Sequence, residues 1–196
     1  VGSEMCIRDR FGHMHKTLLS IFTILFLSIS EVNANKNIIK NLKEGGNIIF
    51  IRHALAPGSG DPENFDLNDC NTQRNLSNQG IKQSERLGLF FLKNQIPIDV
   101  VLSSEWCRCK DTAKYAFGNY KTFSALNSFF SHKFQKNKNT QMKDLREYLK
   151  SWRSDKNLIL VTHYVTILEI INKSSSSGEI LITDSKLNLL GTITDY

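Results

Sequence analysis

Three patterns are missing from this sequence of 196 residues, and each absence narrows the possible functions. The spacing of a zinc knuckle is missing, because Cys107 and Cys109 are separated by one residue and no nearby histidine pair completes a metal set. A second long hydrophobic segment is missing. The sequence also lacks the alternation of aromatic and basic residues that is typical of a nucleic-acid-binding surface. We therefore expect no metal, no cofactor, no nucleic-acid partner and no stable membrane span in the mature chain.

The first residues are not expected to belong to the folded protein. Residues 1–13 contain a segment, Val1–Arg10, that resembles the translation of a transposon sequencing adapter. On that interpretation Met14 is the start and Cys6 leaves the cysteine count. The alternative is a genuine N-terminal extension.

A secretory signal is predicted over residues 14–34. A short basic start is followed by an uncharged run rich in Leu, Ile and Phe, and small residues precede a cleavage point before Asn35. The apolar run is shorter than the ~20 residues of a comfortable bilayer span, although a retained anchor is the alternative. The sequence thus predicts an exported, periplasmic protein with a single domain over residues 35–196.

Charge and cysteine content agree with that location. The formal net charge is +6 at pH 7, and residues 1–34 contribute nothing to it because their basic and acidic residues balance. A basic protein without a nucleic-acid pattern suits an anionic phosphorylated substrate or an anionic envelope surface. The odd number of remaining cysteines predicts one disulfide and one buried thiol in an oxidising compartment.

Strands and helices are predicted to alternate along the chain. Hydrophobic periodicity predicts strands over residues 47–51, 98–102, 123–126, 158–162, 179–183 and 189–195, and helices over residues 78–94, 105–117, 140–152 and 165–172. Residues 57–74 and 133–139 are predicted to be loops. Gly80 and Gly88 are expected to let the first helix approach the sheet. This order predicts a three-layer α/β/α sandwich with a mostly parallel central sheet.

Two of the predicted strands end on a histidine. The apolar run before Arg52 and His53, and the one before His163, are typical of buried parallel strands. Ligands of open α/β sheets bind just beyond the carboxyl ends of such strands. Two imidazoles and an arginine meeting there favour phosphoryl transfer, in which one histidine attacks phosphorus and the other groups hold its oxygens.

Four motifs in order resemble those of the histidine phosphatase superfamily, which has the phosphoglycerate-mutase-like fold. They are Arg52–Ala54 after the first strand, the helix start Leu76–Gly80, the block Ser103–Ala113, and His163 after a late strand. The resemblance covers about residues 47–171 and suggests an exported member similar to branch 1 of the superfamily.

The resemblance assigns roles to four side chains. It implies that His53 is the nucleophile that forms a phosphohistidine, and that Arg52 and Arg108 clamp the phosphoryl oxygens. Guanidinium groups suit that task because they are planar, permanently charged and able to donate two hydrogen bonds at once. His163 is expected to donate to the phosphoryl group from the opposite side.

The general acid is not assigned by any motif. Many members of the superfamily carry a glutamate where this chain has Asn127, and another branch carries an aspartate where it has Tyr164. Asn127 and Ser128 are therefore considered as substrate-binding residues, as is Arg74, for which a surface ion pair is the alternative. Three carboxylates of the long loop are candidate acids: Asp61, Glu63 and Asp66.

Cys70 is expected to pair with Cys107 or Cys109 and so to anchor the long loop beside the arginine-bearing helix. Cys107 is preferred, because Cys109 lies on the inner face of that helix, where the family usually has a small apolar residue. Three independent thiols are the alternative.

These interpretations predict a metal-independent phosphatase that hydrolyses a phosphorylated envelope or periplasmic compound through a phosphohistidine intermediate. A phosphohistidine or phosphoprotein phosphatase is one alternative. A pseudoenzyme that binds phosphate without turnover is the other, and the asparagine at the position of the acid is its main support.

Overall fold

A computed structural model describes residues 37–196, and the domain considered below is the compact unit Asn41–Tyr196. The leader predicted over residues 1–13 and the signal predicted over residues 14–34 lie outside the described residues. Among the described helices, none combines the length and the apolar character that a membrane crossing requires.

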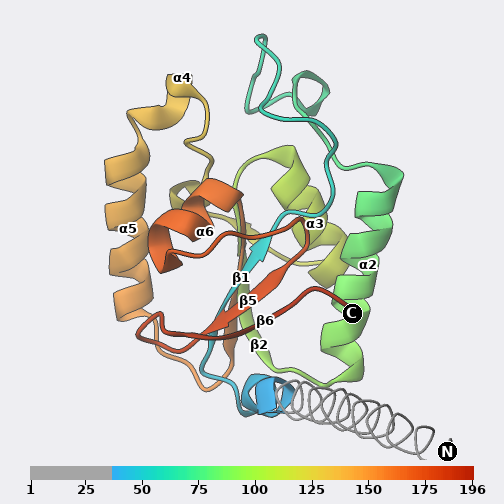
Figure 1. The fold of residues 1–196 in the computed structure, drawn as a ribbon, viewed down its shortest axis with the longest axis vertical. Helices are drawn as coiled ribbons and strands as arrows, with labels where there is room; N and C mark the ends of the chain where they lie inside the picture. The colour runs from blue at the N-terminus through green and yellow to red at the C-terminus, as the bar shows by residue number, and fades with distance from the viewer. Residues whose placement is uncertain (1–36) are drawn as a thin grey trace, which may run out of the picture. The chain divides into compact units, whose positions relative to one another are not determined.

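A six-stranded sheet forms the centre of the domain, with the strand order β3-β2-β4-β1-β5-β6 (Figure 1). Strands β1 to β4 pair in parallel, whereas β5 and β6 are antiparallel to their neighbours. The strands are β1 Ile48–Arg52, β2 Ile98–Ser103, β3 Lys121–Thr122, β4 Asn157–Thr162, β5 Ile180–Thr183 and β6 Leu189–Ile193. The mostly parallel sheet is thereby confirmed.

Helices cover both faces of this sheet, as Figure 1 shows: α2 and α3 lie on one side, and α5 and α6 on the other. The helices are α2 Asn78–Lys93, α3 Cys107–Phe117, α4 His132–Gln135, α5 Lys138–Ser151 and α6 Tyr164–Ile171, with 3₁₀ turns η1 Cys70–Thr72 and η2 Ser124–Leu126. The predicted three-layer sandwich is confirmed.

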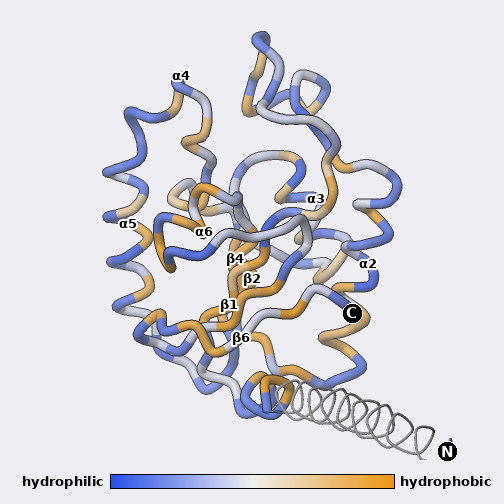
Figure 2. Tube along the Cα trace, in the orientation of Figure 1, coloured by the Kyte–Doolittle hydropathy of each residue, from blue (hydrophilic) through white to orange (hydrophobic). Residues whose placement is uncertain are grey.

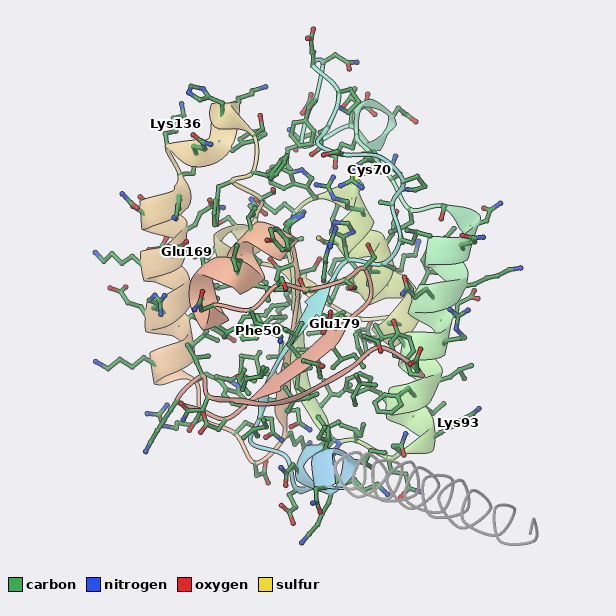
Figure 3. All side chains as sticks on the ribbon, viewed as in Figure 1. Phe50, Cys70, Lys93, Lys136, Glu169 and Glu179 are labelled. Atoms are coloured by element: carbon green, nitrogen blue, oxygen red, sulfur yellow. A yellow bond between two sulfur atoms is a disulfide. The ribbon has the colours of Figure 1, made fainter. Side chains whose placement is uncertain are left out.

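Side-chain alternation along the central strands builds two cores. Phe50 of β1 and Leu160 of β4 belong to the buried cluster that includes Leu145 of α5 and Ile167 of α6. Because successive strand residues face opposite ways, the equally buried Ile49 points to the side of α2 and α3. Figure 2 shows the hydrophobic colour concentrated along β1 and β4, and Figure 3 places the labelled Phe50 within the sheet layer.

The start of α2 follows the sequence prediction, but its glycines serve another purpose. The hydroxyl of Ser77 caps the helix by accepting a hydrogen bond from the amide of Gly80 at 3.1 Å. A Cβ at Gly80 would collide with the carbonyl of Leu55, and one at Gly88 with the carbonyl of Ala116. The glycines therefore allow α2 to approach the segment after β1 and helix α3. The prediction that they allow α2 to approach the sheet was wrong.

The strand predicted over residues 123–126 was also wrong. The strand β3 ends at Thr122, and the residues that follow form the turn η2. Leu126 is fully buried, and its carbonyl accepts a hydrogen bond from the Thr162 hydroxyl at 2.6 Å. The Thr162 side chain of β4 thus provides the hydrogen bond that the backbone of a neighbouring strand would otherwise provide. The segment around Leu126 can therefore turn into the core without forming a strand.

The polar run over residues 133–139 contains most of α4 and the start of α5, so the loop predicted there was wrong. Its one aromatic residue, Phe134, packs against Trp106 and Phe65 with ring centroids 5.3 and 5.4 Å apart. This packing secures a segment whose composition alone favours a surface loop.

Candidate active site

The register of the two central strands brings the two histidines together. Arg52 at the end of β1 pairs with Thr162 at the end of β4, so the residues that follow leave the sheet side by side. The amide of His53 donates to the carbonyl of Thr162 at 2.9 Å. The rings of His53 and His163 lie with their centroids 5.5 Å apart, and both residues are buried.

The surroundings of His53 define its tautomer. Its Nδ1 lies 2.8 Å from the carbonyl oxygen of Ala54, and a carbonyl can only accept. Nδ1 therefore carries the proton, and Nε2 keeps a free lone pair. Burial, together with the charges of Arg108, Arg52 and Arg74, holds the pKa of His53 well below its ordinary value. The imidazole is neutral at pH 7, as a nucleophile must be.

His163 is held by a hydroxyl behind it. Its Nε2 lies 2.9 Å from Oγ of Ser104, whose hydroxyl donates to Oδ1 of Asn127 at 3.1 Å. Because the only hydroxyl proton of Ser104 is used in that bond, Nε2 of His163 is the donor and Nδ1 is bare in the neutral ring. Burial, followed by the charge of Arg108, lowers the pKa of His163 well below its usual value.

Arg52 and Arg108 each carry an unsatisfied buried donor. Nη1 of Arg52 donates to the carbonyl of Ser175 at 2.6 Å, and the terminal nitrogens of Arg108 bind Asp61. The Nε atoms of both arginines are buried and have no hydrogen-bond partner. Nearly all buried N–H groups in proteins are bonded, so two orphaned cationic donors in one site are a place for an anion.

Asp61 of the long loop faces Arg108. Its carboxylate accepts hydrogen bonds from both terminal nitrogens of that arginine, at 2.6 and 3.2 Å, and from Nε1 of Trp106 at 3.0 Å. Burial opposes its ionisation, but the bonds and charge of Arg108 outweigh burial, and the pKa of Asp61 lies below its ordinary value. Asp61 is therefore an ionised acceptor at neutral pH, not a proton donor.

A disulfide between Cys70 and Cys107 fastens the long loop to the first residue of α3, with the two Cα atoms 5.7 Å apart. The preferred pairing is confirmed. The side chain of Gln73 supports the same junction, because its Oε1 accepts from the amide of Cys107 at 2.9 Å. Arg74 ties the loop to itself by donating from Nε to the carbonyl of Gly60 at 2.7 Å. In Figure 3 the labelled Cys70 lies at the end of the domain where this loop and α4 are found.

Cys109 is the free thiol predicted from the cysteine count, and it is fully buried. Its Sγ lies 3.4 Å from Nε2 of His163. Burial raises the pKa of this thiol to about 12.

A cavity of about 130 Å³ lies at the ends of these elements. Most of the residues predicted for the site line it: Arg52, His53, Asp61, Arg74, Arg108, Ser128 and His163. Asn127 does not line the cavity but lies behind its wall, where Nδ2 donates to Oε2 of Glu105 at 2.6 Å. Glu63 and Asp66 also lie outside the cavity lining, and Asp66 accepts from the amide of Asn68.

The aromatic part of this cavity was not predicted from the sequence. Four aromatic residues belong to the lining: Trp106, Phe130, Phe134 and Tyr164. Their positions carried some signal, since Trp106 directly precedes the helix of Arg108 and Tyr164 directly follows His163. The bond between Ser104 and His163 was not predicted either. Among the described residues, no group of three or more His, Cys, Asp or Glu side chains is placed to hold a metal ion.

Neither a protein-family model nor a curated protein matches this chain. Solved structures do match. The protein histidine phosphatase SixA in complex with tungstate is 12% identical, with 76% of this chain and 96% of that chain covered and a TM-score of 0.53. A SixA protein from Agrobacterium tumefaciens is 17% identical, with 77% and 99% covered and a TM-score of 0.54. A phosphoglycerate mutase from Thermus thermophilus is 13% identical, with 76% and 99% covered and a TM-score of 0.52.

These likenesses define the class of fold. The domain has the phosphoglycerate-mutase-like fold, which is the fold that the sequence resemblance implied.

Proposed function

We propose that this protein is a phosphatase that hydrolyses phosphorylated compounds by transferring the phosphoryl group first to His53 and then to water. The observation that carries the proposal is that Arg52 and Arg108, each with a buried and unpartnered Nε donor, line one cavity with a neutral histidine whose Nε2 is free. An anion is needed to satisfy the donors, and a phosphoryl group is an anion that the histidine can attack.

In the first step Nε2 of His53 attacks phosphorus, and the bond from phosphorus to the leaving oxygen breaks with its electron pair on oxygen. The Nε donors of Arg52 and Arg108 bind equatorial oxygens, whose negative charge increases in the transition state. Nδ1 of His53 keeps its proton and donates a hydrogen bond to the carbonyl of Ala54. This bond stabilises the positive ring of the phosphohistidine.

In the second step water attacks phosphorus and the P–N bond breaks, so that His53 regains its lone pair and inorganic phosphate leaves. His163, whose lowered pKa keeps it neutral at pH 7, is held at Nε2 by Ser104 and packs its ring beside that of His53, so the donation predicted for it would require a protonated ring. No metal takes part in either step of this proposal.

The proposal includes a location and a substrate pool. The pattern over residues 14–34 supports export, and the disulfide from Cys70 to Cys107 supports an oxidising compartment. The substrate is then a phosphorylated compound of the cell envelope or periplasm. Phosphohistidine in a protein is the second candidate. The observation in its favour is that Asp61, which lines the cavity, is ionised by Arg108 and so cannot act as the acid.

The test is a comparison of His53→Ala with His132→Ala, the variant of an exposed histidine of α4. We expect His53→Ala to lose acid-labile phosphoenzyme in rapid-quench experiments and to lower kcat/KM by roughly 10⁴-fold or more. Phosphate trapped on the His53→Ala protein would contradict the nucleophile assignment. Phosphate binding without turnover by the unaltered protein would make it a pseudoenzyme.

A further inference from the structure

We propose that the preferred substrates are aryl phosphate monoesters, whose aromatic ring packs against Trp106, Phe130 and Phe134 while the phosphoryl group faces His53. This inference rests on the proposed phosphatase function and names its substrate class. Two independent features of the cavity carry it: a wall of rings and the lack of an available acid.

The wall of rings begins at the nucleophile. The His53 ring lies 5.5 Å from that of His163, the His163 ring 5.5 Å from that of Trp106, and the Trp106 ring 5.3 Å from that of Phe134, centroid to centroid. All four residues line the cavity. A substrate bound at His53 therefore extends along aromatic surface, where edge and stacking contacts favour another ring over an alkyl group.

Two further aromatic side chains line the cavity and remain exposed. Phe130 is 57% exposed and Tyr164 is 36% exposed. The guanidinium of Arg52 lies 5.8 Å from the centre of the Tyr164 ring, so the cationic part of the cavity and its aromatic part adjoin. An aromatic ring attached to a phosphoryl group matches that combination. The ring contacts the aromatic surface, and the anionic phosphoryl group contacts the cationic one.

The lack of an available acid points to the same substrates. Asp61 is the one carboxylate among the described residues that line the cavity, and Arg108 and Trp106 occupy both of its oxygens. The leaving oxygen must then depart as an anion, unaided by a proton. A phenol, with a pKa of ~10 as in tyrosine, releases such an anion far more readily than an alkyl alcohol, whose hydroxyl is as weak an acid as water.

The reaction of an aryl ester balances without a further reactant. His53 Nε2 forms the bond to phosphorus as the P–O bond to the aryl oxygen breaks, and the aryloxide leaves with that electron pair. The aryloxide takes its proton from solvent outside the cavity. Water then cleaves the P–N bond, and its protons pass to phosphate and solvent.

The size of the cavity limits the ring system. A dry cavity of roughly 150 Å³ holds one benzene molecule. The 130 Å³ present here, whose lining includes the exposed Phe130, suits the phosphoryl group and the near part of a single ring.

Three small substrates separate the two features. Phenyl phosphate has a ring and a good leaving group, cyclohexyl phosphate has nearly the same size and a poor leaving group, and acetyl phosphate has a good leaving group and no ring. We expect kcat/KM for phenyl phosphate to exceed that for cyclohexyl phosphate by at least about 100-fold. Equal values for these two esters, in a protein that forms phosphohistidine, would overturn this inference and leave the proposed function intact.

A variant of the wall tests the ring contact directly. Phe130→Ala removes an exposed side chain, so the fold is retained, and we expect it to reduce the ratio of kcat/KM for phenyl phosphate to that for acetyl phosphate by roughly tenfold. Phe130→Trp should restore the ratio, and Leu92→Ala, which alters a 74% exposed apolar side chain of α2, should leave it unchanged. A ratio unaffected by Phe130→Ala would overturn the ring contact.

The source of the aryl phosphate is distinguished by the same assay. Free phosphotyrosine is compared with a peptide that contains phosphotyrosine and with a peptide that contains phosphohistidine. Turnover of either phosphotyrosine substrate supports the inference, and the faster one identifies a small molecule or a protein as the source. A preference for the phosphohistidine peptide of about tenfold or more would overturn it. Failure of every substrate, with no phosphoenzyme, would instead contradict the proposed function.

Discussion

Two of the regions that line the cavity are held in place by different means. One region consists of the ends of β1 and β4, and the main-chain pairing of Arg52 with Thr162 places His53 beside His163. The other is the loop over residues 57–74, which has the single turn η1 as regular helix and is held by a disulfide and by side-chain bonds to its own backbone.

The two regions therefore have different roles: the strand ends position the nucleophile, and the loop forms part of the cavity wall. The strand ends belong to the most deeply buried part of the domain, so the nucleophile is positioned by the core itself. The loop contributes Asp61 and Arg74, whose contacts depend on a few bonds. We therefore expect changes at the strand ends and at the neighbouring Arg108 of α3 to affect turnover, and changes in the loop to affect binding and stability.

Removing the clamp should have the largest effect. We expect Arg108→Ala to lower kcat/KM by roughly 10²–10³-fold, because a buried donor to the developing charge is lost. Lys110→Ala, two residues further along α3, is the matched control and should change little. Equal losses in steady-state assays of the two variants would count against the clamp.

Opening the disulfide should come next. Replacing Cys70 and Cys107 with serine removes a cross-link between residues 37 positions apart, and we expect the free energy of unfolding to fall by roughly 3–4 kcal/mol. The measurement is urea denaturation with and without reductant. Reductant should weaken the unaltered protein and leave the double variant unchanged; the same response in both proteins would show that the bond contributes nothing.

Neutralising Asp61 should have a smaller effect, confined to binding. Its carboxylate occupies the terminal nitrogens of Arg108 and competes with an anion for that arginine. We expect Asp61→Asn to lower the inhibition constant of inorganic phosphate about three- to tenfold, with Asp66→Asn as the control from the same loop. If turnover of alkyl phosphates alone fell instead, Asp61 would be the general acid after all.

Acidification should produce the smallest effect, on stability. The pKa values of His53 and His163 lie well below their ordinary value in the folded protein, mainly through burial, whereas the unfolded histidines titrate at about 6.5. Below that pH the unfolded state binds more protons, so the free energy of unfolding decreases as pH falls and recovers as pH rises toward 7. Melting temperatures between pH 7 and pH 5 measure this slope, which His53→Gln should reduce; an identical slope in that variant would rule the explanation out.

The strand-end region could be predicted from the sequence because it follows from local patterns. An apolar run of five or six residues that ends on histidine specifies both a buried strand and the edge at which its last side chains emerge. The cap of α2 at Ser77 is equally local, since one hydroxyl satisfies one free amide.

The loop region could not be predicted in the same way, because its contacts join residues that are distant in the sequence. The hydrogen bonds that Asp61 accepts from Arg108 and Trp106 join residues more than forty positions apart, and no sequence periodicity predicts them. The aromatic wall was missed for the same reason: Phe134 lies in a polar run, and its importance becomes visible only beside Trp106.

The buried thiol beside His163 gives the protein an internal reporter of its own opening. Cys109 is buried, and because its pKa is about 12 very little of it is present as the reactive thiolate. An alkylating reagent can therefore react with it only when the structure around the active site opens transiently. The labelling rate of the peptide that contains Cys109 therefore measures the population of these openings. A bound oxyanion that bridges Arg52 and Arg108 would hold the site closed and slow the labelling, so occupancy can be followed in a protein that is not turning over.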